Sequence, residues 1–273
     1  MSISTITRRG TLPAALGFLL LLGACAEPEA DTGPEPAIGH VHGLGVNPGD
    51  DRLHVATHFG LYVLDDGELR RVGHDTHDLM GFTVVGEDRF LASGHPVGGD
   101  LPEPMGLVRS DDGGLTWEPV SLTGRADLHG LDADGDDLAA YDSFSGRVLT
   151  STDAGRTFET VGEVEALDVA LTGGGDVAVA GADGVLRLMG GAGEERLGDA
   201  PGLVTIDRVP GGLVGLGPDG RVWVSSDARS WTGRGQVDGV PAAFTVDGDR
   251  WYSASSTGLY VSDDEGASWR DAS

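Results

Sequence analysis

The chain has 273 residues, 46 of them glycine, and a formal net charge of −26 with no lysine. An acidic surface of this size repels nucleic acid and anionic lipid headgroups, so we exclude nucleic-acid binding and attribute the acidity to solubility or to attraction of a cationic ligand or metal. The single cysteine excludes an intrachain disulfide, and the lack of a regular G-X-Y period excludes a collagen-like chain.

The first 24 residues have the features of an export signal. Residues 8 and 9 are both arginine, and the apolar run over 12–22 that follows is too short for a comfortable membrane span. Residues 22–25 read LGAC, which resembles a bacterial lipobox and implies cleavage before Cys25 and attachment of a diacylglycerol to it. We therefore predict a lipoprotein signal peptide over 1–24, exported by the Sec or the twin-arginine route, and an extracytoplasmic protein anchored to the cell membrane.

Residues 25–38 join this anchor to the rest of the chain. After Cys25 the sequence AEPEADTGPEPAI is rich in proline, glutamate and alanine. Such a composition is typical of a solvated, flexible tether. We expect the lipid bilayer to be a partner through this anchor, and we expect the protein to be a monomer.

From residue 39 to the end, the chain repeats about every 40 residues. Each of six units contains four short apolar segments, and the third segment of each unit follows a glycine at position 60, 106, 146, 184, 220 or 258. Four short strands in a unit of about 40 residues are typical of propeller blades, and no helical period interrupts them. The sequence therefore predicts an all-β, six-bladed β-propeller with four-stranded antiparallel blades over 39–273, with an insertion over 95–105 in the second blade.

The turns after several of the third strands share a second pattern. Residues 110–117 read SDDGGLTW, 151–158 read STDAGRTF and 262–269 read SDDEGASW, with a degenerate copy, SSDARSW, at 225–231. Serine and aspartate side chains can hydrogen-bond the backbone N–H groups of such a turn, glycine allows a positive φ, and an aromatic ring can pack between blades. We assign this structural role to Ser110, Asp112, Gly114, Trp117, Ser151, Asp153, Gly155, Phe158, Ser262, Asp264, Gly266 and Trp269.

These turns match the Asp-box, S-x-D-x-G-x-T-W, so the chain resembles the BNR/Asp-box group of propellers, which includes sialidases, other glycoside hydrolases and proteins without enzymatic activity. The HGLGV sequence at 42–46 and the GHP sequence at 94–96 are also similar to a family of bacterial lipoproteins described as glycosylhydrolase-like. The resemblance implies that the Asp-box turns lie on the face of the propeller away from the ligand site.

The histidines gather on the opposite face. In a four-stranded blade, the connection into strand 1 and the connection between strands 2 and 3 reach the same face, and seven of the eight histidines lie in these connections or at their edges. Only His54 lies inside a strand, and all eight belong to the first three blades. We predict a ligand site at this channel mouth that uses His40, His42, His58, His77, His95 and His129.

A metal is one interpretation of this site. A His-x-His pair on a strand places both rings on one side, and imidazoles with nearby carboxylates suit zinc, copper or iron. The predicted metal ligands are His42, His58, His77, His95, His129, Asp78 and Asp127. Two other interpretations stay open: a pocket for a small molecule or glycan, and histidines that only cap loops.

A glycoside hydrolase at the same face is the alternative function. The resemblance to sialidases implies an arginine triad and a tyrosine nucleophile, but the early Arg-Ile-Pro element is absent, and Arg125 and Arg208 do not complete a triad. A general glycosidase needs two carboxylates about 5–9.5 Å apart. The candidates by position are Asp78, Asp127, Asp142 and Asp168, with Tyr141 beside Asp142.

Overall fold

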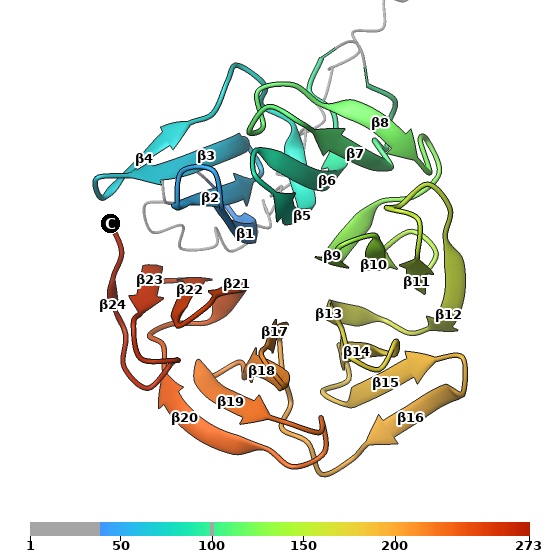
Figure 1. Ribbon diagram of the computed structural model, residues 1–273, viewed down its shortest axis with the longest axis vertical. Coiled ribbons are helices and arrows are strands. Elements are labelled where there is room, and N and C mark those ends of the chain that lie inside the picture. Colours follow the sequence, from blue (N-terminus) through green and yellow to red (C-terminus); the bar gives the residue numbers. More distant parts are fainter. Residues whose placement is uncertain (1–38, 99–100) are drawn as a thin grey trace, which may run out of the picture. The chain divides into compact units, whose positions relative to one another are not determined.

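The computed structural model describes residues 39–98 and 101–273, and within these residues the chain forms 24 strands and no helix (Figure 1). The predicted signal peptide, the lipidation site at Cys25 and the tether lie outside the described residues. A search of the described residues for a helix long and apolar enough to cross a membrane finds none.

The strands fall into six antiparallel sheets of four, as predicted. The first three sheets contain β1 (Val41–Asn47), β2 (Arg52–Thr57), β3 (Gly60–Asp65), β4 (Glu68–Arg71), β5 (Asp78–Gly86), β6 (Arg89–His95), β7 (Leu107–Ser110), β8 (Glu118–Ser121), β9 (Leu128–Asp134), β10 (Asp137–Asp142), β11 (Arg147–Ser151) and β12 (Glu159–Glu163). The long connection between β6 and β7 corresponds to the insertion predicted in the second blade.

The last three sheets contain β13 (Ala166–Leu171), β14 (Val177–Gly181), β15 (Leu186–Gly190), β16 (Gly193–Leu197), β17 (Thr205–Val209), β18 (Gly212–Leu216), β19 (Arg221–Ser225), β20 (Thr232–Gln236), β21 (Pro241–Asp247), β22 (Arg250–Ser255), β23 (Gly258–Ser262) and β24 (Arg270–Asp271). Every sheet consists of four consecutive strands, so each sheet is one blade.

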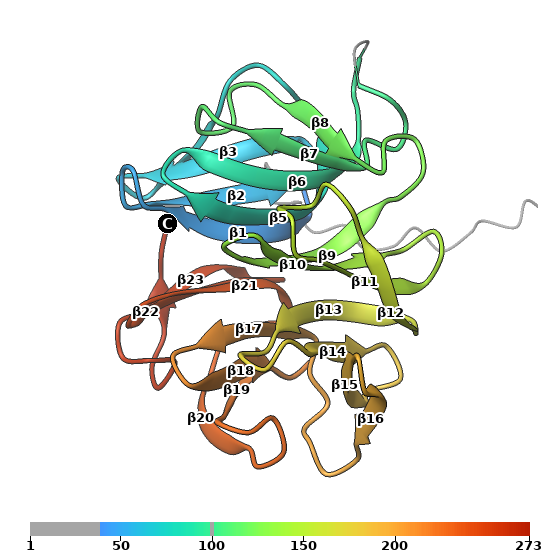
Figure 2. The ribbon, with the colours of Figure 1, turned by 45° about the vertical axis from the view of Figure 1, so that its right-hand side comes forward.

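The six blades are arranged in a ring, with the first strand of each blade nearest the centre (Figure 1). These inner strands are β1, β5, β9, β13, β17 and β21. β1 lies between β5 and β21, so the last blade lies beside the first, and β5 lies between β1 and β9 (Figures 1 and 2). The predicted six-bladed propeller is therefore confirmed.

The hydrophobic core is divided among the seams between blades. Each of the six buried apolar clusters combines side chains from two neighbouring blades. One cluster joins blade 1 to blade 6, where Leu44 and Val55 pack with Ala243 and Val261. Because each sheet lies between two others, its strands bury both faces, which explains their continuous apolar runs.

The S-x-D-x-G turns are held by their own side chains. Ser151 Oγ accepts a hydrogen bond from the Gly155 N–H at 3.0 Å and donates one to Asp153 Oδ1 at 2.8 Å. Asp153 also accepts hydrogen bonds from the backbone N–H and the hydroxyl of Thr157. The same bonds recur in the turns at 110–116 and 262–268. The serine and aspartate therefore stabilise these turns.

The glycine of each turn packs against the preceding blade. Gly155 has a φ of +78°, and a Cβ added to it would lie 2.2 Å from Leu107 of blade 2. Gly114 has the same relation to Leu61 of blade 1, whereas a Cβ at Gly266 would lie 2.7 Å from Trp251 of its own blade and 3.0 Å from Val222 of blade 5. These turns need glycine for two reasons: a left-handed conformation and close contact between blades.

We expect Gly155→Ala to lower the free energy of unfolding by about 1–3 kcal/mol more than Gly146→Ala does. Both glycines have a positive φ, but a Cβ at Gly146 would meet no atom within 4 Å. The difference between the variants therefore isolates the close packing at position 155, against Leu107 of blade 2 and Leu138 of blade 3. Urea denaturation of the two proteins measures it, and equal destabilisation would show that only the backbone conformation requires glycine.

Candidate functional site

Three predicted ligands converge at the seam between blades 1 and 2. His42 lies in β1, His58 directly follows β2, and Asp78 begins β5. His42 Nε2 lies 3.3 Å from His58 Nδ1 and 3.8 Å from Asp78 Oδ1, and His58 Nδ1 lies 2.9 Å from the same Asp78 oxygen. Within the described residues, this is the one group of three such side chains whose ligand atoms all lie within 4.8 Å of one another.

The size of this triangle matches a metal coordination sphere. Imidazole nitrogens and carboxylate oxygens bind zinc at about 2.0–2.2 Å, so two ligand atoms of a tetrahedral site lie about 3.4 Å apart. The three separations in the group, 2.9, 3.3 and 3.8 Å, bracket this value. One cation could therefore contact all three atoms after only small side-chain movements.

The protonation state of His42 also suits a ligand. Burial and the neighbouring His58 together lower the pKa of its imidazole to about 4, against the opposing effect of Asp78. His42 is therefore neutral at pH 7 and carries a lone pair on one ring nitrogen, which is the form that binds metals.

A second group of predicted ligands lies at the seam between blades 2 and 3. The Asp127 carboxylate oxygen Oδ2 lies 2.7 Å from His129 Nε2 and 3.5 Å from His95 Nε2, and it accepts a hydrogen bond from the Ser143 hydroxyl. His95 Nδ1 in turn lies 2.6 Å from Glu103. The structure therefore brings His95, His129 and Asp127 together, apart from the first group.

The charges of this second group are set by its hydrogen bonds. Burial opposes ionisation of Asp127, but the hydrogen bond from His129 and the charge of that ring outweigh it and lower the carboxyl pKa. Burial also lowers the pKa of His95, yet the hydrogen bond to Glu103 and the charge of Asp127 raise it overall. Asp127 is therefore a stable carboxylate that holds imidazole N–H groups.

The remaining histidines have other surroundings. The His40 ring lies 5.3 Å from the His58 ring, at the edge of the first group, and His74 is exposed. His77 is buried and its Nδ1 accepts a hydrogen bond from the Val97 N–H. We call His42, His58 and Asp78 the metal-sized group. His77 directly precedes Asp78, and adjacent residues of an extended chain point to opposite sides, which explains why only Asp78 belongs to this group. His54, in β2, packs against Phe90 of the neighbouring blade 2.

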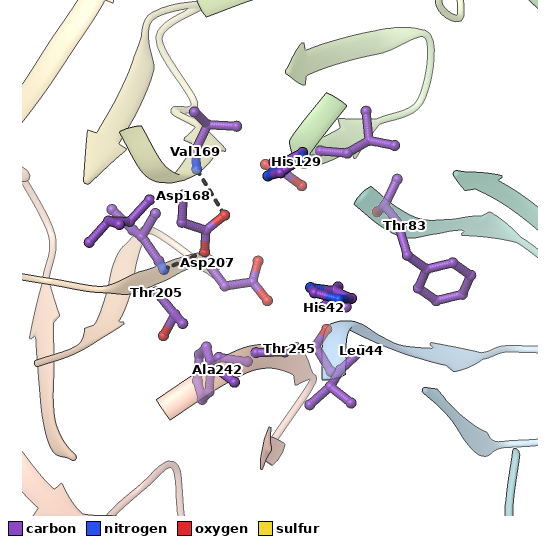
Figure 3. Close-up of a pocket in the computed structure, with 18 of the residues that line it drawn as sticks. His42, Leu44, Thr83, His129, Asp168, Val169, Thr205, Asp207, Ala242 and Thr245 are labelled. Atoms are coloured by element: carbon purple, nitrogen blue, oxygen red, sulfur yellow. Dashed lines mark hydrogen bonds between the residues drawn. The ribbon is translucent and has the colours of Figure 1, made fainter. Parts of the chain in front are cut away.

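A pocket of about 650 Å³, including the part open to solvent, lies at the centre of the ring. His42, His129, Asp132, Asp168 and Asp207 are among the residues that line it. Asp168 and Asp207 lie across the pocket from His42 and His129 (Figure 3). His42 therefore belongs both to the metal-sized group and to the pocket.

The three aspartates connect inner strands of neighbouring blades. Their Oδ2 atoms accept hydrogen bonds from backbone N–H groups of the next blade, at 2.7 Å for Asp132, 2.9 Å for Asp168 and 2.8 Å for Asp207. Of the three, only Asp168 is among the candidates predicted from the sequence. The signal was an apolar residue followed by aspartate in the first strand of three successive blades, at 131–132, 167–168 and 206–207.

These buried carboxyls resist ionisation. Burial raises the pKa of Asp168 to about 7 and that of Asp207 to about 8, and the charge of Asp132 adds to both shifts. The backbone hydrogen bonds act in the opposite direction but do not outweigh burial.

The other catalytic candidates are engaged elsewhere. Tyr141 is buried in the apolar cluster between blades 3 and 4. Asp142 accepts hydrogen bonds from the Asp127 and Phe144 N–H groups and from the Ser145 hydroxyl. Arg208 pairs with Asp132 and Asp134, and Arg125 is exposed.

Comparisons with known proteins show the fold and nothing finer. No protein-family model matches the chain, and no curated protein matches it. Among solved structures, a gluconolactonase from Xanthomonas campestris is 14% identical with a TM-score of 0.64, and the match covers 81% of this chain and 85% of that one. Virginiamycin B lyase from Staphylococcus aureus is 11% identical with a TM-score of 0.57, covering 81% and 80%.

A structure of YCF48 bound to a D1 peptide is also similar, at 13% identity and a TM-score of 0.53, covering 86% of this chain and 83% of that one. All three are β-propeller proteins. Since their names cover enzymes and a peptide-bound propeller, the likeness does not decide between catalysis and binding.

We expect Asp207→Asn to lessen the loss of stability as the pH rises from 5 to 8. The pKa of Asp207 is about 8 in the folded protein and about 3.9 for an ordinary aspartate in an unfolded chain. Between these two values the folded state holds a proton that the unfolded state has released, so the free energy of unfolding falls as the pH rises, by at most about 1.4 kcal/mol per pH unit. Asparagine cannot ionise.

Urea denaturation of wild type and variant at several pH values measures the two slopes. Asp199→Asn, at an exposed position, is the matched control and should leave the wild-type slope unchanged. Parallel slopes for wild type and Asp207→Asn would contradict the prediction.

Proposed function

We propose that this protein is an extracytoplasmic, lipid-anchored β-propeller that binds one transition metal at its channel mouth through His42, His58 and Asp78. The observation that carries the proposal is the triangle of ligand atoms with separations of 2.9, 3.3 and 3.8 Å. Zinc, copper and iron are the candidate ions, because imidazole with a carboxylate suits all three.

The ligand set favours an open coordination position. Structural zinc sites close the coordination sphere with four protein ligands, whereas three ligands leave a position for water or substrate. His42 lines the central pocket, so the open position would face a space that can admit a small molecule. The site therefore fits the binding of a small polar ligand at a metal better than a purely structural role.

Of the seven metal ligands predicted from the sequence, three belong to the proposed site. The group around Asp127 forms its own hydrogen-bonded set, and His77 is bonded to the backbone of Val97. Glycoside hydrolysis at the same face stays a prediction, with Asp78, Asp127, Asp142 and Asp168 as its candidate carboxylates.

We expect the full chain, solubilised in detergent and purified without a histidine tag, to contain about one transition metal per molecule. His58→Ala should weaken metal binding by more than about 100-fold, because two remaining ligands cannot replace the third. Elemental mass spectrometry after dialysis against zinc, copper or iron measures the content and identifies the ion.

His74→Ala is the matched control, since His74 is an exposed histidine of the same face. It should keep the wild-type metal content. Wild-type protein that stays empty after loading, or His58→Ala that retains the full content, would refute the metal site and favour a metal-independent pocket.

A further inference from the structure

Asp168 and Asp207 line the central pocket without a cationic partner. None of the described residues that line this pocket is an arginine, and the chain contains no lysine. Arg208 follows Asp207 in sequence, but its guanidinium forms ion pairs with Asp132 and Asp134. Among the described residues, no side-chain cation therefore compensates the charge that Asp168 and Asp207 would carry when ionised.

The same two carboxyl groups are only half used as hydrogen-bond acceptors. In each of them, one oxygen accepts the N–H of the following residue, and the other accepts an N–H of the next blade. An ionised carboxylate has about four lone-pair sites, so each oxygen can accept one more hydrogen bond. Both side chains lie in the pocket, across from His42 and His129 (Figure 3). The remaining acceptor capacity is therefore available to a ligand.

The Thr205 hydroxyl is an independent indication of a ligand. Thr205 is only 3% exposed, its Oγ1 has no hydrogen-bond partner among the described residues, and it lines the same pocket. It lies two residues before Asp207 in β17, so the two side chains project from the same side of the strand. The N–H between them, that of Ile206, is held by Asp168. A buried hydroxyl without a partner costs free energy, which a ligand that hydrogen-bonds it would recover.

We propose that Asp168, Asp207 and Thr205 bind the ammonium group of a primary amine. An alkylammonium has three N–H donors and a positive charge, and these three side chains offer two carboxylates and a free hydroxyl. A bare metal ion fits this place less well, because the one metal-sized group within the described residues contains none of the three. The amine site goes beyond the proposed metal site and does not depend on it.

Binding of an ammonium group should release protons from the pocket. Burial raises the pKa of Asp168 to about 7 and that of Asp207 to about 8, and a cation between them lowers both values again. An alkylammonium stays charged at these pH values, so its affinity should rise between about pH 6 and about pH 8. The other titratable groups that line the pocket are Asp132, His42 and His129. His42, with a pKa of about 4, stays neutral throughout this range.

Isothermal titration calorimetry of the full chain in detergent tests the proposal, with propylammonium as the probe. We expect saturable binding whose heat differs between cacodylate and HEPES buffers at pH 7, because the released protons are taken up by the buffer. Propionamide has no charge, and tetramethylammonium has a charge but no N–H donor, so both should bind about 10-fold or more weakly. Failure of propylammonium to bind, or equal affinity for all three compounds, would overturn the proposal.

Two variants separate a ligand site from a purely structural role. Asp207→Asn should weaken propylammonium binding by about 10-fold or more and reduce the proton release, because the amide cannot ionise. Thr205→Val should weaken binding by a similar factor, yet the urea midpoint of the unliganded protein should stay the same or rise, because the lost hydroxyl has no partner there. Asp199→Asn, at an exposed position, is the matched control and should bind as wild type does. Wild-type affinity in Asp207→Asn or in Thr205→Val would overturn the site.

The titrations use protein stripped of metal with EDTA and dialysed, so their outcome is independent of the metal site. Binding of propylammonium by protein that never takes up a metal would support the amine site and refute only the metal. A second probe, Nα-acetyl-lysine amide, carries the same ammonium group on a lysine side chain. Tighter binding of this probe than of propylammonium would support the site with a lysine of a partner protein as its ligand, and weaker binding would support it with a free amine. Failure of both probes to bind would overturn it.

Discussion

Closure of the ring is the constraint on which the site depends. Every blade consists of four consecutive strands, so blade 6 and blade 1 share no sheet, and they are joined through the apolar cluster around Val55 and Val261. This packing holds β1 between β21 and β5. β1 carries His42, which belongs to both the metal-sized group and the pocket. Disruption of this seam would therefore displace the His42 side chain from both.

The seams also explain why the polar groups form pairs. The end of a second strand in one blade lies beside the start of the first strand in the next blade. His58 meets Asp78 in this way, and His95 meets Asp127 one blade later. The two pairs occupy equivalent positions in the repeat, so one structural rule generates both. The third member of each group differs. His42 belongs to blade 1, the blade of His58, whereas His129 belongs to blade 3, the blade of Asp127.

The sequence predicted the fold almost completely, because short apolar segments separated by turn residues, repeated about every 40 residues, can be recognised without knowledge of distant contacts. It also predicted the face on which the histidines lie, since that follows from strand order alone. It could not divide the seven predicted ligands into two groups of three and the separate His77, because the distance between His58 and Asp78 across a seam depends on blade rotation. His77 illustrates the same limit: its position in sequence is as suitable as that of Asp78, but its side chain points to the other side of the strand.

Burial shifts the pKa values of side chains in both chemically different halves of the pocket. Burial lowers the pKa of His42 to about 4 and raises that of Asp207 to about 8. Both shifts favour the uncharged form near pH 7, so the centre of a chain with a formal charge of −26 is less charged than its composition indicates. A neutral imidazole can bind a cation, and a protonated carboxyl can donate a hydrogen bond. Desolvation therefore gives one half of the pocket a neutral imidazole, which the proposed metal site requires, and the other half a carboxyl that can donate a hydrogen bond.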